Sequence, residues 1–191
     1  MKKLIIITGD LATGKSHLAR LLSERYSVKM YCKDTVKERL CEKYDYTERE
    51  QNRKLSKLAV SLMTYGFFHS RKSGEDLIME ANFRTEELLK IDRIASSAGY
   101  DVLNLVLRAD VDIIYERFLN RIENENRHPA HTVGFDGYES FKEYIARGRE
   151  QETFGRTIEI LADDFSYKTD DELLAKIDSF MEKNENYRNF R

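Results

Sequence analysis

The chain has 191 residues, with 32 Lys and Arg against 34 Asp and Glu and a formal net charge of −2. This length favours one domain, spanning residues 1–191, with a core of its own. The charge is dense but balanced, so no net positive field exists to hold nucleic acid or anionic lipid, and both are disfavoured as partners. Two cysteines are too few for a disulfide framework, which favours a reducing, cytoplasmic setting. The first apolar run, at residues 4–7, is shorter than the ~7–15 residues of a signal peptide, and no stretch approaches the ~20 apolar residues of a membrane span.

Short apolar runs alternate with segments of helical periodicity in the first half of the chain. The run at 4–7 ends in Gly9, as a buried strand of a parallel sheet does. Thr47 and Glu50 have the spacing of a capping box and predict the start of a long helix. In chain order we expect a strand at 4–7, a helix with Leu18, Leu21 and Leu22 on one face, a strand at 28–31, a short helix from near Thr35 and a long helix from Thr47 to about His69.

The second half continues the same alternation. In chain order we expect a strand at 76–80, a helix capped by Thr85 that stops at Gly99, a strand at 102–107, a helix capped by Asp110, a loop at 124–137, a helix with Phe141 and Ile145 on one face, a strand at 157–161 and a last helix with Leu173, Ile177 and Phe180 on one face. Strands and helices in alternation imply an α/β domain with a mainly parallel sheet and right-handed crossovers.

The one specific motif lies directly after the first strand. Residues 9–16, Gly-Asp-Leu-Ala-Thr-Gly-Lys-Ser, match the phosphate-binding pattern G-x-x-x-x-G-K-[ST]. A chance match in such a chain has a probability of roughly 1%, and the strand before it and the helix after it are the context that the motif needs. Lys15 would reach the β- and γ-phosphates, and the Ser16 hydroxyl would ligate Mg²⁺. The predicted nucleotide-binding residues are Gly9, Asp10, Leu11, Ala12, Thr13, Gly14, Lys15, Ser16 and His17.

Asp34 follows the second strand, where a parallel sheet presents its carboxyl ends beside the phosphate-binding loop. A carboxylate there would hold a substrate hydroxyl in line or accept its proton. The alternative is that Asp34 only caps the short helix behind it. Lys33, Lys37 and Arg39 have two interpretations as well, an anion site or a solvated helix face, and the second is the commoner.

Glu80 ends the buried strand at 76–80, a place where P-loop proteins usually carry an acid that orders Mg²⁺ and its waters. Asp is the commoner residue there, so the match is partial. A surface strand end is the alternative. We expect Ser16 and Glu80 to hold the metal, with Asn82 or Arg84 facing the substrate.

Arg117 and Arg121 lie four residues apart on one helix face and precede a loop with Arg127. Arginines of a lid would cover the phosphates and neutralise charge in the transition state, and Arg121 and Arg127 are the best candidates. Ordinary ion pairing is the alternative for any single one. His128 and His131 share the loop, but two histidines without a clear third ligand are weak support for zinc.

Taken together, four stretches resemble the small bacterial P-loop "predicted kinase" family, which is related to the zeta-toxin, polynucleotide-kinase-like, gluconate-kinase and shikimate-kinase groups. They are residues 9–16, 33–38, 80–84 and 127–131. The resemblance implies a three-layer P-loop fold with a five-stranded parallel sheet, a substrate-binding helical segment near 35–70, and an arginine-bearing lid at 117–150. It also implies that residues 162–164 border the adenine. The chain departs from the family at one point: none of its expected strands ends in the Asp that usually helps to bind Mg²⁺.

The resemblance implies phosphoryl transfer from ATP with Mg²⁺. The leading hypothesis is a kinase that moves the γ-phosphate to a hydroxyl of a small molecule, with Lys15, Asp34, Arg121 and Arg127 as catalytic residues. Three alternatives remain: a polynucleotide or nucleotide kinase, a non-catalytic nucleotide switch, and a zeta-type toxin. The balanced charge argues against the first, because a nucleic-acid channel is usually basic.

Overall fold

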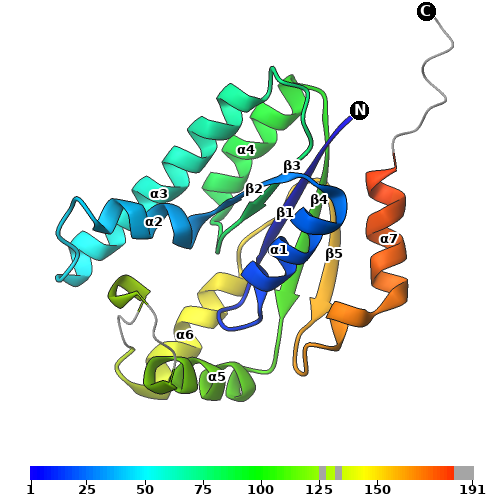
Figure 1. Cartoon of the computed structure of the whole chain (residues 1–191). Coiled ribbons are helices and arrows are strands. Elements are labelled where there is room, and N and C mark those ends of the chain that lie inside the picture. The colour runs from blue at the N-terminus through cyan, green and yellow to red at the C-terminus, as the bar shows by residue number, and fades with distance from the viewer. Residues whose placement is uncertain (125–127, 132–134, 183–191) are drawn as a thin grey trace, which may run out of the picture.

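Five parallel strands form one sheet in the middle of the molecule (Figure 1). The computed structural model describes residues 1–124, 128–131 and 135–182. The strands stand in the order β2-β3-β1-β4-β5. Their bounds are Lys2–Gly9 (β1), Lys29–Cys32 (β2), Leu77–Glu80 (β3), Tyr100–Arg108 (β4) and Arg156–Leu161 (β5). Each coincides with a strand expected from the sequence, and every neighbouring pair is parallel, so the α/β prediction is confirmed.

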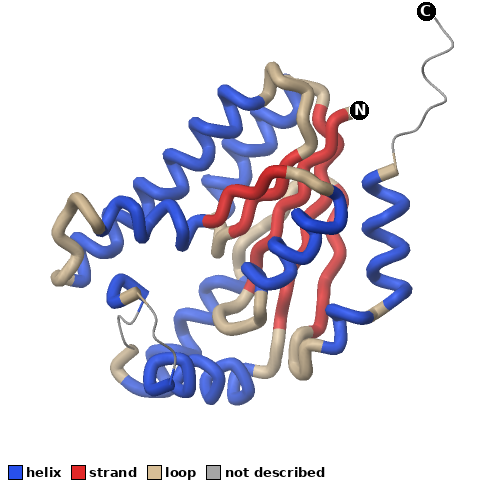
Figure 2. The backbone as a smooth tube through the Cα atoms, in the orientation of Figure 1, coloured by secondary structure: helices blue, strands red, loops and turns tan. Residues whose placement is uncertain are grey.

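Helices lie on both sides of this sheet, which makes three layers (Figure 2). The described residues form α1 (Lys15–Tyr26), α2 (Lys33–Cys41), α3 (Arg49–Ser70), α4 (Thr85–Ser97), α5 (Val111–Asn124), α6 (Gly137–Arg149) and α7 (Asp171–Met181), with short 3-10 helices η1 (Pro129–His131) and η2 (Ser166–Thr169). Within that part of the chain, no helix combines the length and the apolar character needed to cross a bilayer.

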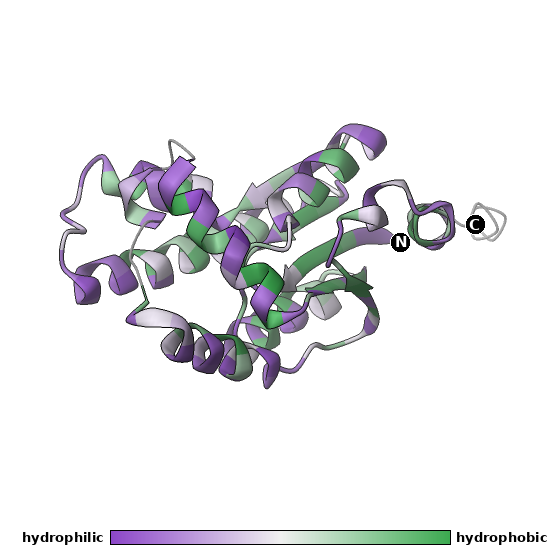
Figure 3. Ribbon diagram, turned by 90° about the horizontal axis from the view of Figure 1, so that it is seen from below, coloured by the Kyte–Doolittle hydropathy of each residue, from purple (hydrophilic) through white to green (hydrophobic). Residues whose placement is uncertain are grey.

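The central strand β1 is buried on both faces, which explains its continuous apolar run. Leu4 and Ile6 pack with α3 and α4, whereas Ile5 and Ile7 pack with α1, α5, α6 and α7. In Figure 3 the strands are largely hydrophobic and the outer helices carry many hydrophilic residues. The two cores therefore fix the register of β1, since a slip by one residue would exchange its two faces.

The long helix α3 begins one residue later than the capping box of Thr47 and Glu50 predicts. Its N-cap is Glu48, and Gln51 completes the box. The Thr47 hydroxyl instead donates to Asp45 at 2.9 Å, so it is already engaged in a local turn. The helix itself runs to Ser70, close to the predicted end at His69.

The strand register brings the candidate residues to one edge of the sheet. Cys32 of β2 and Ile7 of β1 both stand opposite Glu80 of β3. The phosphate-binding loop follows β1 and Asp34 follows β2, so both begin at the same level as the Glu80 carboxylate. Parallel strands present their carboxyl ends at a common edge, which is where α/β proteins bind ligands.

Candidate active site

The two glycines of the phosphate-binding loop stand where no other residue fits. Gly9 has φ = 118°, and a Cβ there would lie 2.1 Å from the Leu107 carbonyl oxygen of β4. Gly14 has φ = 86°, and its Cβ would lie 2.5 Å from the Tyr167 hydroxyl. That hydroxyl donates to the Thr13 carbonyl at 2.9 Å. The loop is thus curled between β4 and η2, and α1 begins directly behind it with its N-terminal amides turned to the loop.

Lys15 is buried inside this loop and donates to the Asp10 carbonyl oxygen. Burial lowers the pKa of Lys15 to about 8, although the charges of Glu80 and Asp34 oppose that shift. A buried ammonium of this kind is stabilised when an anion is placed beside it. Glu80 and Asp34 are therefore close enough for their charges to act on Lys15.

Ser16 and Glu80 meet at the point where the sequence predicts a magnesium site. The Ser16 hydroxyl donates to Glu80 Oε2 at 3.1 Å, and the Cys32 thiol donates to the same oxygen at 2.8 Å. Glu80 is only 4% exposed. A hydroxyl and a carboxylate oxygen suit the hard Mg²⁺ ion, so the residues present fit it. Burial raises the pKa of Cys32 to about 11, so this thiol is a neutral donor to Glu80.

Asp34 is not the cap of α2. The N-cap is Cys32 and Asp34 is the second residue of the helix, so the capping interpretation is wrong. Its Oδ1 lies 3.8 Å from Lys33 Nζ and 3.8 Å from Nδ1 of His131. Its side chain is 37% exposed. The carboxylate thus lies at the surface of the site, and its charge still acts on Lys15.

The predicted lid arginines differ in where they lie. Arg117 donates to the carbonyl oxygens of Ala162 and Asp163, and its guanidinium lies 3.9 Å from the ring centre of Phe165. It is thus anchored beside the segment expected to border an adenine. Arg121 lies on α5 one turn further on, and its charge acts on the hydroxyl of Tyr167. Arg127 lies outside the described residues.

An arginine that the sequence analysis missed holds the start of the phosphate-binding loop. Arg149, the last residue of α6, donates through Nη2 to Asp10 Oδ2 at 2.7 Å and to the Ala109 carbonyl at 2.5 Å. Asp10 Oδ2 also accepts from the Ala109 amide at 3.3 Å. The Asp10 side chain is therefore a structural anchor. No local signal marks this pair, because its members are 139 residues apart.

A hydrogen bond joins Lys37 to the segment that carries His128 and His131, and neither interpretation of Lys37 predicts this contact. Lys37 is buried and donates to the Ala130 carbonyl of η1 at 2.9 Å, so it does not lie on a solvated helix face. His131 Nε2 lies 3.0 Å from Glu38 Oε1. No three His, Cys, Asp or Glu side chains of the described residues are placed to hold a metal ion, so no zinc site involving His128 and His131 is found among them.

A cleft of about 950 Å³ opens beside the phosphate-binding loop. It is lined by Gly9 and Asp10, by Asn82 and Arg84 behind β3, and by residues of α3, α4, β4 and α6. Asn82 and Arg84 thus lie where the sequence predicts a substrate. Asp34 is not among the described residues that line it.

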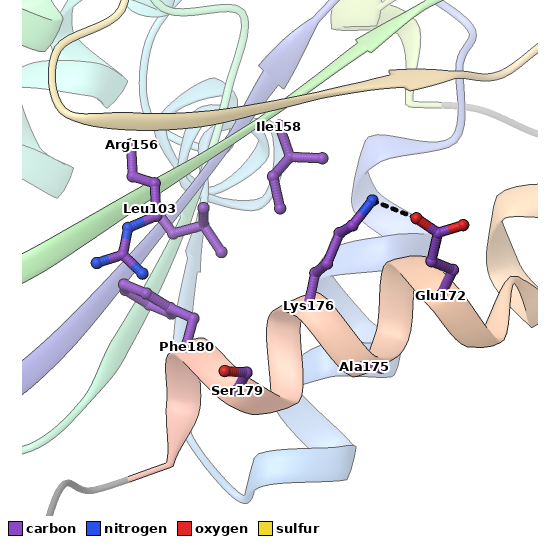
Figure 4. Close-up of a pocket in the computed structure, with 8 residues that line it drawn as sticks. All are labelled: Leu103, Arg156, Ile158, Glu172, Ala175, Lys176, Ser179 and Phe180. Carbon is purple, nitrogen blue, oxygen red and sulfur yellow. Dashed lines mark hydrogen bonds and ion pairs between the residues drawn. The ribbon is translucent and has the colours of Figure 1, made fainter.

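A second hollow of about 440 Å³ lies at the edge of the sheet, between the edge strand β5 and α7 (Figure 4). Its polar contact is an ion pair of Lys176 with Glu172 at 2.7 Å, one turn apart on α7. Arg156 of β5 stands over the ring of Phe180 there. No residue of the phosphate-binding loop lines this hollow, so the cleft beside that loop is the candidate site.

The sequence matches a protein family over most of its length. Residues 5–155 match the family described as AAA domain, and the chain belongs to this P-loop family. Several of its structural neighbours are kinases, among them a shikimate kinase and a gluconokinase, and its fold is the P-loop kinase-like fold. No curated protein matches the sequence.

Three solved structures have a fold similar to that of this chain. A "putative kinase" from Chloroflexus aurantiacus superposes with a TM-score of 0.79 at 24% identity, covering 95% of this chain and 99% of that one. A shikimate kinase from Bacteroides thetaiotaomicron gives 0.57 at 12% identity over 93% and 97%. The Pnkp1/Rnl/Hen1 RNA repair complex gives 0.56 at 16% identity, covering 78% of this chain but 44% of that one. At these identities the likeness shows the fold alone.

Proposed function

We propose that this protein is an ATP-dependent kinase that transfers the γ-phosphate to a hydroxyl group of a small molecule. The observation that carries the proposal is the meeting of Lys15, Ser16 and Glu80 at the carboxyl edge of the sheet, beside a cleft of about 950 Å³. The family and the fold support phosphoryl transfer from a nucleotide.

The nucleotide would bind through the loop at residues 9–17. Backbone amides of the loop and the N-terminus of α1 attract the phosphates, and Lys15 gives up its bond to the Asp10 carbonyl to reach the β- and γ-phosphates. Ser16, with Glu80 behind it, would hold Mg²⁺, which when bound draws charge from the β- and γ-phosphates. Arg117 and the segment at 162–164 would face the adenine.

The transfer itself would depend on Asp34 and on the arginines of the lid at 117–150. Asp34 orients the acceptor hydroxyl toward the γ-phosphorus and accepts its proton as the new P–O bond forms. Arg121 and Arg127 close over the γ-phosphate and neutralise the charge that spreads over its oxygens. Positioning and electrostatics then supply most of the acceleration.

The cleft beside the phosphate-binding loop has the size and charge of a small-molecule site rather than of a nucleic-acid channel. Its volume falls within the roughly 300–1,000 Å³ of small-molecule sites. The charged side chains that line it are mixed, with Arg49, Arg84, Arg108 and Arg147 against Asp10, Glu86, Glu143 and Glu150. A channel for a phosphate backbone would need an excess of positive charge. The helical segment at 35–70 contributes Arg49 to this wall.

An acceptor screen tests the proposal. Sugars, sugar acids, aminoglycosides and nucleosides are offered with ATP and Mg²⁺, ADP release is measured, and Lys15→Ala is the blank. Acceptor-dependent ADP release that the blank lacks supports the kinase. ATP binding without transfer to any acceptor would indicate a nucleotide switch, and salt-dependent transfer to an oligonucleotide would indicate a nucleic-acid kinase.

A further inference from the structure

Hydrogen bonds and apolar contacts hold the 3-10 helix η1 against α2 and α3. Two buried polar side chains, Lys37 of α2 and Asn52 of α3, donate to the same Ala130 carbonyl at 2.9 and 3.0 Å. Lys37 also donates to Asn52 Oδ1 at 2.5 Å. The Ala130 side chain packs between Cys41 and Leu55 in a small core of its own. Buried polar groups are costly unless paired, so these contacts define one position for this part of the predicted lid.

That position places His131 between two carboxylates of α2. Its Nε2 lies 3.0 Å from Glu38 Oε1, and its Nδ1 lies 3.8 Å from Asp34 Oδ1. The imidazole side chain is 9% exposed, so bulk water has little access to it. The two acids are four residues apart and therefore share one face of α2.

The hydrogen bond to Glu38 determines where the imidazole carries its proton. An ionised carboxylate only accepts, so Nε2 must be the N–H donor. In the neutral ring Nδ1 then holds a lone pair, which is turned toward Asp34. A proton arriving on Nδ1 would produce an imidazolium flanked by two negative charges.

We propose that His131 is a positioning residue that takes over, from Asp34, the proton released by the acceptor hydroxyl. This rests on the proposed function of Asp34. As the acceptor oxygen bonds to the γ-phosphorus, the bond from that phosphorus to the β,γ-bridging oxygen breaks and ADP leaves. The acceptor proton passes to Asp34, and from Asp34 to Nδ1 of His131. The Asp34–His131 distance must shorten by about 1 Å for the second step to follow a hydrogen bond. Asp34 returns to its ionised form, and the imidazolium of His131 releases the proton to water after the products leave, which restores the neutral ring for the next turnover.

The surroundings of His131 suit this role. Burial lowers the pKa of His131, while the charges of Asp34 and Glu38 oppose that shift and Lys37 adds to it. Those three side chains of α2 and His128 of its own segment are the titratable groups described around the ring, and α3 contributes the uncharged Asn52 to the same segment. The ring is thus neutral at rest and ready to accept a proton, since the imidazolium would be paired on both sides.

The first experiment needs no acceptor. The His131 imidazole is titrated by NMR in the wild type, in Asp34→Asn and in Glu38→Gln, with Glu42→Gln, just after the last residue of α2, as control. We expect the Nε2–H tautomer at neutral pH and a lower His131 pKa in both test variants, because each loses a negative charge beside the ring. An unchanged pKa in Asp34→Asn would overturn the proposal whether or not the protein is a kinase.

The second experiment separates proton transfer from packing. His131→Gln keeps a donor for Glu38 but accepts no proton. Lys37→Met removes a contact that holds η1 but keeps the imidazole, so it should retain the pH step that His131→Gln lacks. With an acceptor from the screen, we expect His131→Gln to lower kcat about 10-fold, less than the roughly 100-fold expected for loss of Asp34 itself. Wild-type kcat should fall as pH falls through the His131 pKa, and His131→Gln should lack that step. The same step in both proteins would show that His131 is only structural.

Discussion

The guanidinium of Arg149 lies 2.7 Å from Asp10 Oδ2 and links the end of α6 to the first residue of the phosphate-binding loop proper. The Asp10 carboxylate is almost fully buried, and Arg149 is the charge that compensates it. Because the backbone carbonyl of Asp10 accepts from Lys15, the same residue couples α6 to the buried lysine. The shape of the loop therefore depends on the far end of the predicted lid.

Replacing Arg149 with Met should destabilise the protein and weaken ATP binding together. Loss of one partner leaves the Asp10 charge buried without compensation, which costs about 2 kcal/mol here, below the roughly 3–5 kcal/mol of fully buried pairs, because Arg149 is partly exposed. Urea unfolding and ATP titration measure the two effects. Arg147→Met is the matched control, since Arg147 forms an exposed pair with Glu143. Equal stability of the two variants would contradict the assigned role of Arg149.

ATP affinity should decrease as pH rises through about 8, the pKa of the Lys15 ammonium in the free protein. Binding needs the charged form, so affinity is full well below that pKa and falls by up to about tenfold per pH unit above it. Lys15→Ala should abolish transfer. Lys15→Arg stays charged over this range, and any ATP binding it retains should lose the pH dependence. Isothermal titration at several pH values checks this, and a flat profile for the wild type would be the contrary result.

Glu80→Gln should raise the Mg²⁺ concentration needed for half-maximal activity, by about tenfold or more, because a neutral amide is a poorer partner for the cation and its ligand Ser16. ATP binding without Mg²⁺ should change little. Glu75→Gln, just before β3 at the opposite end of the strand, is the control, since Glu75 pairs with Lys29 on the surface. An unchanged Mg²⁺ requirement in Glu80→Gln would remove Glu80 from the metal site.

Asp34→Asn should leave ATP binding intact and reduce turnover with the true acceptor by roughly 100-fold or more, the usual effect of losing a general base. Asp45→Asn, an exposed residue in the turn before α3, should behave as wild type in both assays. Normal turnover in Asp34→Asn would show that another group orients the acceptor.

The sequence predicted the parts of this molecule that depend on local pattern. The five strands, the loop at 9–16 and the helix capped by Asp110 all follow from periodicity or from one short motif, and Asp110 Oδ1 does accept from the Asp112 amide. The capping residue of a helix is harder to predict from sequence, because several nearby side chains compete for the same backbone amides. Thr85 was expected to cap α4, but it is the first residue of that helix, and its amide and hydroxyl donate to Gln151.

Polar contacts between residues far apart in the sequence cannot be predicted from local sequence patterns. Nothing near Lys37 shows that it is buried against Ala130, 93 residues away, and Arg149 looks like any basic residue at a helix end. Both pairs form only when α6 and η1 are brought to the sheet and to α2. The sequence thus located the loop and the strand ends, whereas the groups that hold them in place appear only in three dimensions.

The hydrogen bond from Tyr167 to Thr13 spans 154 residues of chain. During synthesis, the first β-strand and the glycine-rich turn leave the ribosome long before η2 exists. Contacts of such separation form late, because a long loop must close before they add stability. The nucleotide site would therefore be completed only after η2 has been synthesised, and the loop would reach its ATP-binding shape only from that point on.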